Sequence, residues 1–176
     1  MNVRNPGIAN FGVTIIQSRH SVRKFKEEEI PPEFIRKVLE CASKAPTGRN
    51  KQPWIFVVIK NKDTLKKLAE FAPTGQFIEG AAVGFLVFGQ ADWKFTVEDC
   101  SAATENLLLA IHAYGYGGCW IAGNQMPYAD AVRELAAIPE TYKLVSIVAA
   151  GVPDVGGITL TEKISLDKLV FFEKYS

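Results

Sequence analysis

The chain has 176 residues, of which 48% are hydrophobic and 22% are charged, and its formal net charge is +1. These values predict one globular domain spanning residues 1–176 and exclude a disordered chain, which needs low hydrophobicity and a high net charge. Twenty Lys and Arg residues against nineteen Asp and Glu residues leave no global field for nucleic acid or an anionic membrane, so an anionic ligand needs a local cluster of cations.

The first half of the chain contains three predicted helices and one strand. Residues 10–18 have apolar side chains that share a helical face, and residues 32–44 form a second amphipathic helix that opens after two prolines. Residues 54–60 (WIFVVIK) are a short apolar run rich in β-branched and aromatic residues, which is typical of a central strand buried on both faces. Asp63 is expected to cap the third, short helix.

The second half contains two more strands and two more helices. Residues 81–89 and 144–151 are apolar runs that predict buried strands. Between them, the sequence T-V-E-D at Thr96 resembles a capping box and opens a long helix over 96–114, which is followed by a short helix over 128–137. Strands separated by helices indicate an α/β or α+β sandwich whose sheet is covered on both faces.

The C-terminal segment, residues 152–176, does not fit this pattern. It begins with Pro and Gly and then carries a series of apolar side chains far from the compact part of the sequence. An apolar tail in solvent is unfavourable, so we expect this segment either to fold back or to pack on a partner subunit.

The cysteines and the N-terminus indicate the compartment. Three cysteines give an odd count, with no Cys-x-x-Cys pair and no histidine at metal-ligand spacing, which argues against a disulfide framework and a metal site. The first residues lack the apolar stretch of a signal peptide, and no run approaches the roughly 20 apolar residues of a membrane helix. We therefore expect a cytoplasmic protein.

A basic segment, Ser18-Arg-His-Ser-Val-Arg-Lys-Phe25, follows the first predicted helix. Arg19 and Arg23 lie on either side of the Ser21 hydroxyl in a chain whose charge is otherwise balanced. Guanidinium groups present forked donors that match phosphate oxygens, and a hydroxyl adds another donor. The segment is therefore either a monophosphate clamp or a solvated basic turn.

A polar loop, Ala45-Pro-Thr-Gly-Arg-Asn-Lys-Gln-Pro-Trp54, separates the second helix from the first strand. Asn50 and Gln52 carry both donors and acceptors, as the edge of a heterocycle requires, and Thr47 and Gly48 would let the backbone approach a flat ligand. The alternative is a helix stop followed by a turn.

A glycine-rich stretch covers residues 115–123, after the long helix. Its spacing does not match G-x-G-x-x-G, and the chain contains no P-loop, so we interpret it as a helix C-cap with Gly at positive φ entering a strand. No G-x-S-x-G or H-E-x-x-H motif is present. We interpret Cys119 as a buried inert thiol and His112 as a histidine hydrogen-bonded to a neighbour, and we predict no catalytic side chain.

Four segments in this order, residues 18–25, 45–54, 99–120 and 162–170, resemble motifs of the nitroreductase family of FMN-dependent oxidoreductases. The resemblance covers nearly the whole chain. It implies an α+β fold, a three-layer sandwich with a central, mostly antiparallel sheet flanked by helices. It also implies an intertwined homodimer that exchanges C-terminal tails and binds FMN at the interface.

The resemblance assigns three groups of residues to FMN. The contacts to the phosphate would come from Arg19, His20, Ser21, Arg23 and Lys163. The contacts to the flavin from the second subunit would come from Pro46, Thr47, Gly48 and Asn50. Further contacts along the ring or ribityl chain would come from Gln52, Gln76, Ala122 and Gly123. Lys163 replaces the family's usual Arg and lacks its bidentate fork.

The activity implied is a ping-pong cycle in which NADH or NADPH delivers hydride to flavin N5 and a small-molecule acceptor then removes it. The acceptors would be nitroaromatics, quinones or similar compounds. The alternatives are specialised flavin chemistry, such as reductive dehalogenation or flavin destruction, and a flavin-binding protein without turnover. The short stretch between Phe88 and Thr96 predicts an open, promiscuous pocket, and amides near Gly123 are expected to donate to the reduced flavin.

Overall fold

The computed structural model describes residues 6–157 and 161–175. The helices are α1 (Pro6–Ser18), α2 (Pro32–Ala42), α3 (Lys62–Phe71), α4 (Thr96–Ala113) and α5 (Ala129–Leu135). The strands are β1 (Trp54–Ile59), β2 (Val83–Gln90), β3 (Gly117–Ala122) and β4 (Tyr142–Gly151). Short 3₁₀ turns are η1 (Gly48–Asn50), η2 (Pro73–Gly80), η3 (Val155–Gly157) and η4 (Leu166–Lys168).

The four named strands form one antiparallel sheet in the order β1-β2-β4-β3. The prediction that residues 54–60 form a central strand is wrong, because among the described strands β1 pairs with β2 alone and lies at an edge. All its residues are half-buried, whereas β2 and β4 are buried along most of their length. The apolar run in β1 reflects helices over both faces of the sheet, and it does not determine strand order.

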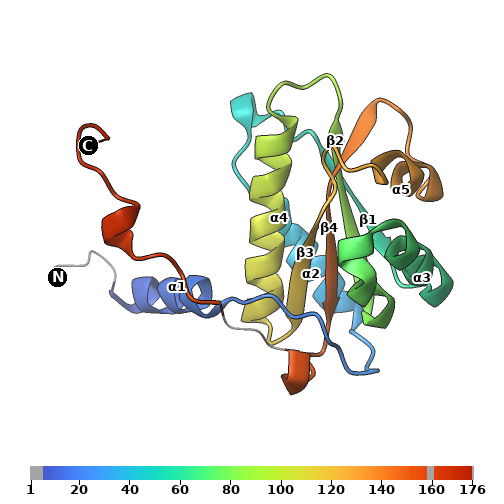
Figure 1. Ribbon diagram of the computed structural model, residues 1–176, viewed down its shortest axis with the longest axis horizontal. Helices are drawn as coiled ribbons and strands as arrows, with labels where there is room; N and C mark the ends of the chain where they lie inside the picture. Colours follow the sequence, from blue (N-terminus) through green and yellow to red (C-terminus); the bar gives the residue numbers. More distant parts are fainter. Residues whose placement is uncertain (1–5, 158–160, 176) are drawn as a thin grey trace.

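Helices cover both faces of this sheet (Figure 1). Because side chains alternate along a strand, Leu86 and Phe88 of β2 face α3, η2 and α5, while Val83 and Phe85 face α2 and α4. The predicted α+β three-layer sandwich is therefore confirmed. Among the described residues, no helix is long and apolar enough to cross a membrane.

Helix α4 packs against the sheet through buried polar bonds as well as apolar contacts. Thr104 donates or accepts a hydrogen bond of 2.7 Å with Ser146 of β4. The predicted capping box at Thr96 is wrong: Phe95 is the N-cap without a side-chain bond, and the Thr96 hydroxyl instead donates to the Gln90 carbonyl. At the other end, Gly115 has a φ of +81°, which confirms the predicted glycine cap.

The N-cap of helix α3 lies two residues before the predicted one. Asn61, and not Asp63, is the N-cap, and its side-chain oxygen accepts a hydrogen bond of 2.9 Å from the Thr64 amide. Asp63 lies within the first turn, where a carboxylate interacts favourably with the helix dipole. Both residues suit a helix start, so the sequence located the helix but not its cap.

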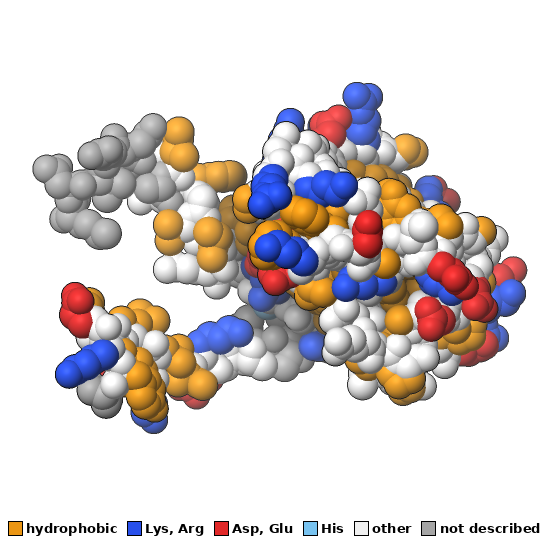
Figure 2. All heavy atoms as spheres, turned by 90° about the horizontal axis from the view of Figure 1, so that it is seen from above, with side chains coloured by type: hydrophobic (Ala, Val, Ile, Leu, Met, Phe, Trp, Pro, Cys, Tyr) orange, Lys and Arg blue, Asp and Glu red, His pale blue; other side chains and the backbone are white. Residues whose placement is uncertain are grey.

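Two arms extend from the compact body on the same side (Figure 1). One is α1, with exposed Phe11 and Ile16, and the other is the C-terminal segment 161–175, where Phe172 and Tyr175 are each 86% exposed. Figure 2 shows apolar side chains on both arms. The start of the predicted tail does fold back, because Val152 and Asp154 bond to Lys26 and Lys24. Residues 161–175 are exposed instead, and their packing on a partner stays a prediction.

Candidate functional site

The basic segment after α1 runs in an extended conformation beside β3. The Val22 amide donates to the Gly118 carbonyl at 3.0 Å, and Val22 is 1% exposed. Its side chain packs on Gly117, where an added Cβ would lie 2.7 Å from the Val22 Cβ. Because side chains alternate in an extended chain, burial of Val22 directs Ser21 and Arg23 to the opposite side.

Three of the predicted phosphate contacts surround the Cys119 thiol on β3. Burial raises the pKa of Cys119, while the charges of Arg23 and Arg19 and a hydrogen bond from Ser21 lower it. Arg19, Ser21 and Arg23 therefore all lie near enough to Cys119 to act on it, and their contact with a phosphate stays a prediction. The predicted buried thiol is also confirmed, since Cys119 is 2% exposed.

The flanks of this cluster are fixed by neighbouring side chains. Arg19 forms an ion pair of 3.8 Å with Glu105 of α4. His20 hydrogen-bonds through Nδ1 to the Ser18 carbonyl, and its ring packs edge-on against His112 at 5.6 Å. His112 Nε2 lies 2.8 Å from the Ser18 hydroxyl, which confirms its predicted hydrogen bond.

The 3₁₀ turn η2 lies alongside the same strand. Arg23 stands over the Phe77 ring at 5.8 Å, and Gly75 packs on Ile121 of β3. Gln76 lies between these two contacts and is exposed. The side chain of Gln76 is therefore carried on a turn that borders both the basic cluster and β3.

The end of β3 differs from the expectation in one respect. Ala122 is exposed and Gly123 is buried, but the Gly123 and Asn124 amides both donate to the Val145 carbonyl, at 3.1 and 3.0 Å. The expectation that amides near Gly123 donate to a flavin is therefore wrong for these two groups. Tyr128, which the sequence did not single out, donates its hydroxyl to the Ala122 carbonyl and fixes the strand end.

The polar loop after α2 is held by bonds within itself. The Gln52 amide donates to the Thr47 hydroxyl at 3.1 Å, and the Gln52 side chain donates to Asn50 Oδ1, also at 3.1 Å. Arg49, Asn50 and Gln52 have φ values of 55°, 54° and 50°. Non-glycine residues in this left-handed region cost about 1–3 kcal/mol each and persist where the surroundings hold them.

Sequence reasoning also missed a buried residue that holds the polar loop. The buried Asp99 carboxylate of α4 accepts a hydrogen bond of 3.1 Å from the Gly48 amide and another of 2.8 Å from the Trp93 indole. An added Cβ on Gly48 would lie 2.9 Å from the Phe95 ring and 3.2 Å from the Trp93 ring. Glycine is therefore needed at this position to leave room for these two aromatic side chains. The pairing of Asp99 with Gly48 spans 51 residues, and no local pattern could have indicated it.

The loop and the basic cluster contact different parts of α4. Gly48 bonds to Asp99 in the first turn, Arg19 pairs with Glu105 near the middle, and Ser18 bonds to His112 in the last turn. With a rise of about 1.5 Å per residue, Asp99 lies about 9 Å from Glu105 and about 20 Å from His112 along the helix. Within one chain, the loop and the basic segment therefore contact α4 at different levels.

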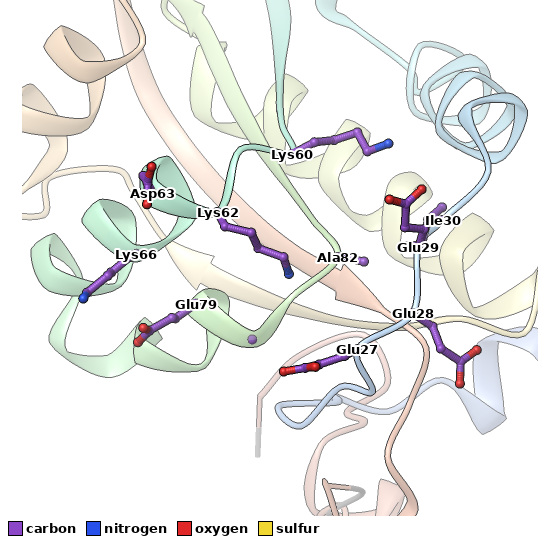
Figure 3. A pocket seen from close by; sticks show the side chains of 11 residues that line it. Glu27, Glu28, Glu29, Ile30, Lys60, Lys62, Asp63, Lys66, Glu79 and Ala82 are labelled. Atoms are coloured by element: carbon purple, nitrogen blue, oxygen red, sulfur yellow. The ribbon is translucent and has the colours of Figure 1, made fainter.

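Lys163 and Pro46 are both exposed, Lys163 on the C-terminal arm and Pro46 at the start of the loop. A separate groove of about 660 Å³ lies between the segment 27–30, the start of α3 and the turn after η2 (Figure 3). Lys62 points into it and donates to the Ala81 carbonyl at 2.9 Å. None of the predicted site residues lines this groove.

The chain is similar to proteins of one family. A model of the Nitroreductase family matches residues 16–82 and 72–152. A relative from Archaeoglobus fulgidus, provisionally named NADH dehydrogenase/NAD(P)H nitroreductase, is 36% identical over 79% of this chain and 83% of its own length. An iodotyrosine deiodinase from Thermotoga neapolitana is 26% identical over 80% of this chain and 87% of its own.

A solved structure gives the same result for the fold. The crystal structure of a provisional nitroreductase from Desulfovibrio desulfuricans, in complex with FMN, superposes with a TM-score of 0.83 at 29% identity. The match covers 99% of this chain and 100% of that chain. The arms as well as the sandwich are therefore included in the similarity.

Proposed function

The chain belongs to the nitroreductase family, and we propose that it is an FMN-dependent oxidoreductase that uses NADH or NADPH to reduce nitroaromatics, quinones or similar acceptors. The observation that carries this proposal is the basic segment with Arg19, Ser21 and Arg23, which is held against Gly118 of β3 by the Ser21 bridge and the Val22 amide. Two guanidinium groups and a hydroxyl match the donor set that a phosphate monoester requires. The cluster therefore fits the FMN phosphate in a chain with almost no net charge.

The strand β3 supports the placement of the rest of the cofactor. Ser21 bridges to Gly118, and Ala122 lies four residues further along the strand, which corresponds to about 13 Å. An extended ribityl chain running along β3 would therefore bring the ring toward Ala122, with Gln76 on the neighbouring turn η2. Lys163 on the C-terminal arm would add a further cation at the phosphate.

A second copy of the chain would complete the site. The loop carrying Pro46, Thr47, Gly48 and Asn50 contacts α4 about 20 Å from its last turn, where α1 is attached. Its polar groups would then reach the flavin bound by the partner. Exposed apolar side chains on both arms support the same homodimer, because a monomer would leave them in water.

Bound FMN would supply the redox chemistry, taking hydride from the reduced nicotinamide and passing it to the acceptor. The residues of this chain would bind and orient it: Arg19 and Arg23 hold the phosphate, and Asn50 presents an amide to the ring edge. The thiol of Cys119 stays protonated because burial raises its pKa, so it does not compete with the phosphate for the arginines. The proton that accompanies reduction of a quinone or nitro group would come from solvent, so no side chain is required to transfer it.

The acceptor pocket is expected to be open. Strand β2 ends at Gln90 and α4 begins at Thr96, so only a turn separates them. Within it, the Trp93 and Phe95 rings pack edge to face at 5.4 Å, and Phe95 is 36% exposed. A short aromatic turn of this kind offers a stacking surface for flat acceptors without enclosing them.

Reductive dehalogenation is the second candidate, because one relative that aligns over most of its length is an iodotyrosine deiodinase. The two activities are separated by measuring turnover of the FMN-loaded protein with a nitroaromatic, a quinone and an iodotyrosine. We expect the first two to be reduced at comparable rates. Turnover of iodotyrosine alone would overturn the reductase proposal in favour of dehalogenation, and a colourless protein that takes up no FMN would overturn both.

The free thiols of Cys41, Cys100 and Cys119 agree with the proposed cytoplasmic location.

A further inference from the structure

A buried carboxylate connects the two segments that border the proposed acceptor side of the site. Asp99 is 6% exposed, and its two oxygens accept from different donors: Oδ1 from the Gly48 amide at 3.1 Å and Oδ2 from the Trp93 indole at 2.8 Å. Gly48 belongs to the polar loop and Trp93 to the turn between β2 and α4. Asp99 thus ties two irregular segments to the first turn of the longest helix.

Burying a carboxylate is unfavourable unless hydrogen bonds compensate it. Here the two donors and the amino end of α4 supply that compensation. The charge also acts on Asp99's neighbour: burial, followed by the charge of Asp99, raises the pKa of Cys100 to about 12. An apolar residue would fill this position without the cost of burying a charge, so the carboxylate is best explained by the donors that it holds in place.

The loop that Asp99 holds has a strained backbone. Arg49, Asn50 and Gln52 all have positive φ values, and two hydrogen bonds join Gln52 to Thr47 and Asn50 within the loop. At the end of the loop, the Pro53 carbonyl accepts a hydrogen bond of 3.1 Å from the Gln90 amide of β2. The bond from Gly48 to Asp99 attaches the loop to the helical body, and the Trp93 and Phe95 rings fill the space beside Gly48. The conformation of the loop, and with it the direction of the Asn50 amide, therefore depends on Asp99.

We propose that Asp99 is a positioning residue that sets the geometry of both the flavin-facing loop and the aromatic turn on the acceptor side. This inference rests on the proposed FMN function. Asp99 acts through Gly48 on flavin binding and through Trp93 on acceptor binding. The two effects can be separated, because each oxygen has its own donor.

The test compares three variants of the full-length protein. Asp99→Asn keeps the shape but replaces one acceptor by a donor. Trp93→Phe removes the indole donor together with part of the ring. Glu98→Gln removes an exposed carboxylate from the same turn as a control. FMN affinity is measured by fluorescence titration, and the geometry of the bound flavin by its visible circular dichroism. Exchange of the Gly48 amide in the apoprotein is measured by NMR.

Loss of a charge-assisted hydrogen bond predicts that Asp99→Asn weakens FMN binding by about tenfold to a hundredfold. The same variant should alter the flavin dichroism and speed exchange at Gly48, while Glu98→Gln stays within about twofold of the wild type. Unchanged affinity and dichroism in Asp99→Asn would overturn the inference and leave the proposed function standing. If the wild type binds no FMN, the proposed function fails. Amide exchange of Gly48 that is unchanged in Asp99→Asn would show that the bond to Asp99 does not hold the loop, and would contradict the inference.

Should Asp99→Asn fail to fold, Trp93→Phe carries the test, because it leaves the carboxylate and the loop in place. We expect the KM for an aromatic acceptor to rise severalfold while kcat and FMN affinity stay within about twofold. An unchanged KM would contradict a role for Asp99 in holding the aromatic turn.

Discussion

Removing Arg19 or Arg23 from the basic segment should weaken FMN binding, and we expect the loss to be larger for Arg23. A charge-assisted hydrogen bond contributes about 1.5–3 kcal/mol, or about tenfold to 150-fold in the dissociation constant. Arg19 already pairs with Glu105 at 3.8 Å, with side-chain exposures of 23% and 49%. Giving up such a partly exposed pair costs up to about 1 kcal/mol, which reduces the net contribution of Arg19.

Arg23 has no such competitor, since it stands over the Phe77 ring and pairs with no carboxylate in the part of the chain that the structure describes. We therefore expect Arg19→Ala to weaken FMN binding by about tenfold and Arg23→Ala by up to about a hundredfold. Fluorescence titration of the apoprotein with FMN measures both. The matched control is Lys24→Ala, which removes the same charge from a 66% exposed side chain.

Lys24 pairs with Asp154 at 3.5 Å and should matter little to FMN, because salt screens exposed charges beyond about 8–10 Å. A loss of affinity confined to the arginine variants would support the clamp. Affinity that is unchanged in Arg19→Ala and Arg23→Ala, or lowered equally in all three variants, would mean that the segment is only a solvated basic turn.

Three further predictions concern the arms and the contact between α1 and α4. Lys163→Ala should weaken FMN binding severalfold and Lys163→Arg should restore or improve it, because a guanidinium adds a bidentate contact; equal affinities in a titration would place Lys163 outside the site. Phe172→Glu should shift the protein from dimer to monomer in sedimentation experiments, and an unchanged sedimentation profile would contradict tail packing on a partner. Burial, and then the charges of His20 and Arg19, lower the pKa of His112 from its usual 6.5. As the pH falls below 6.5, the unfolded chain therefore protonates His112 before the folded chain does, and the free energy of unfolding decreases. His112→Gln should flatten the decline in Tm between about pH 8 and about pH 5, and an identical decline in both proteins would refute this.

The sequence predicted those parts of the fold that local patterns determine. The apolar face of α2, the position of α4 and the glycine cap at Gly115 follow from neighbouring residues, and the structure has all three. Strand order depends on pairing between distant segments, so the apolar pattern of β1 was compatible with both a central and an edge position. The start of α4 shows a similar limit, because the Thr96 hydroxyl bonds to Gln90 across a turn.

The same division applies to the site. The basic segment with Arg19, Ser21 and Arg23 could be recognised because its residues are neighbours in the sequence, whereas its extended conformation depends on the pairing with Gly118 of β3. Asp99 and Tyr128 were missed because their partners, Gly48 and Ala122, become neighbours only through tertiary packing. The amide of Gly123 was expected to be free for a ligand, but the turn after β3 directs it to the Val145 carbonyl.

Rapid anaerobic mixing of the purified, FMN-loaded protein with NADH and with NADPH tests the central claim most directly. Hydride transfer to the bound flavin should bleach its visible absorption with at least one donor, and adding a quinone or nitroaromatic should then restore the absorption. Flavin that stays oxidised with both donors would contradict the account and leave a protein that binds FMN without turnover.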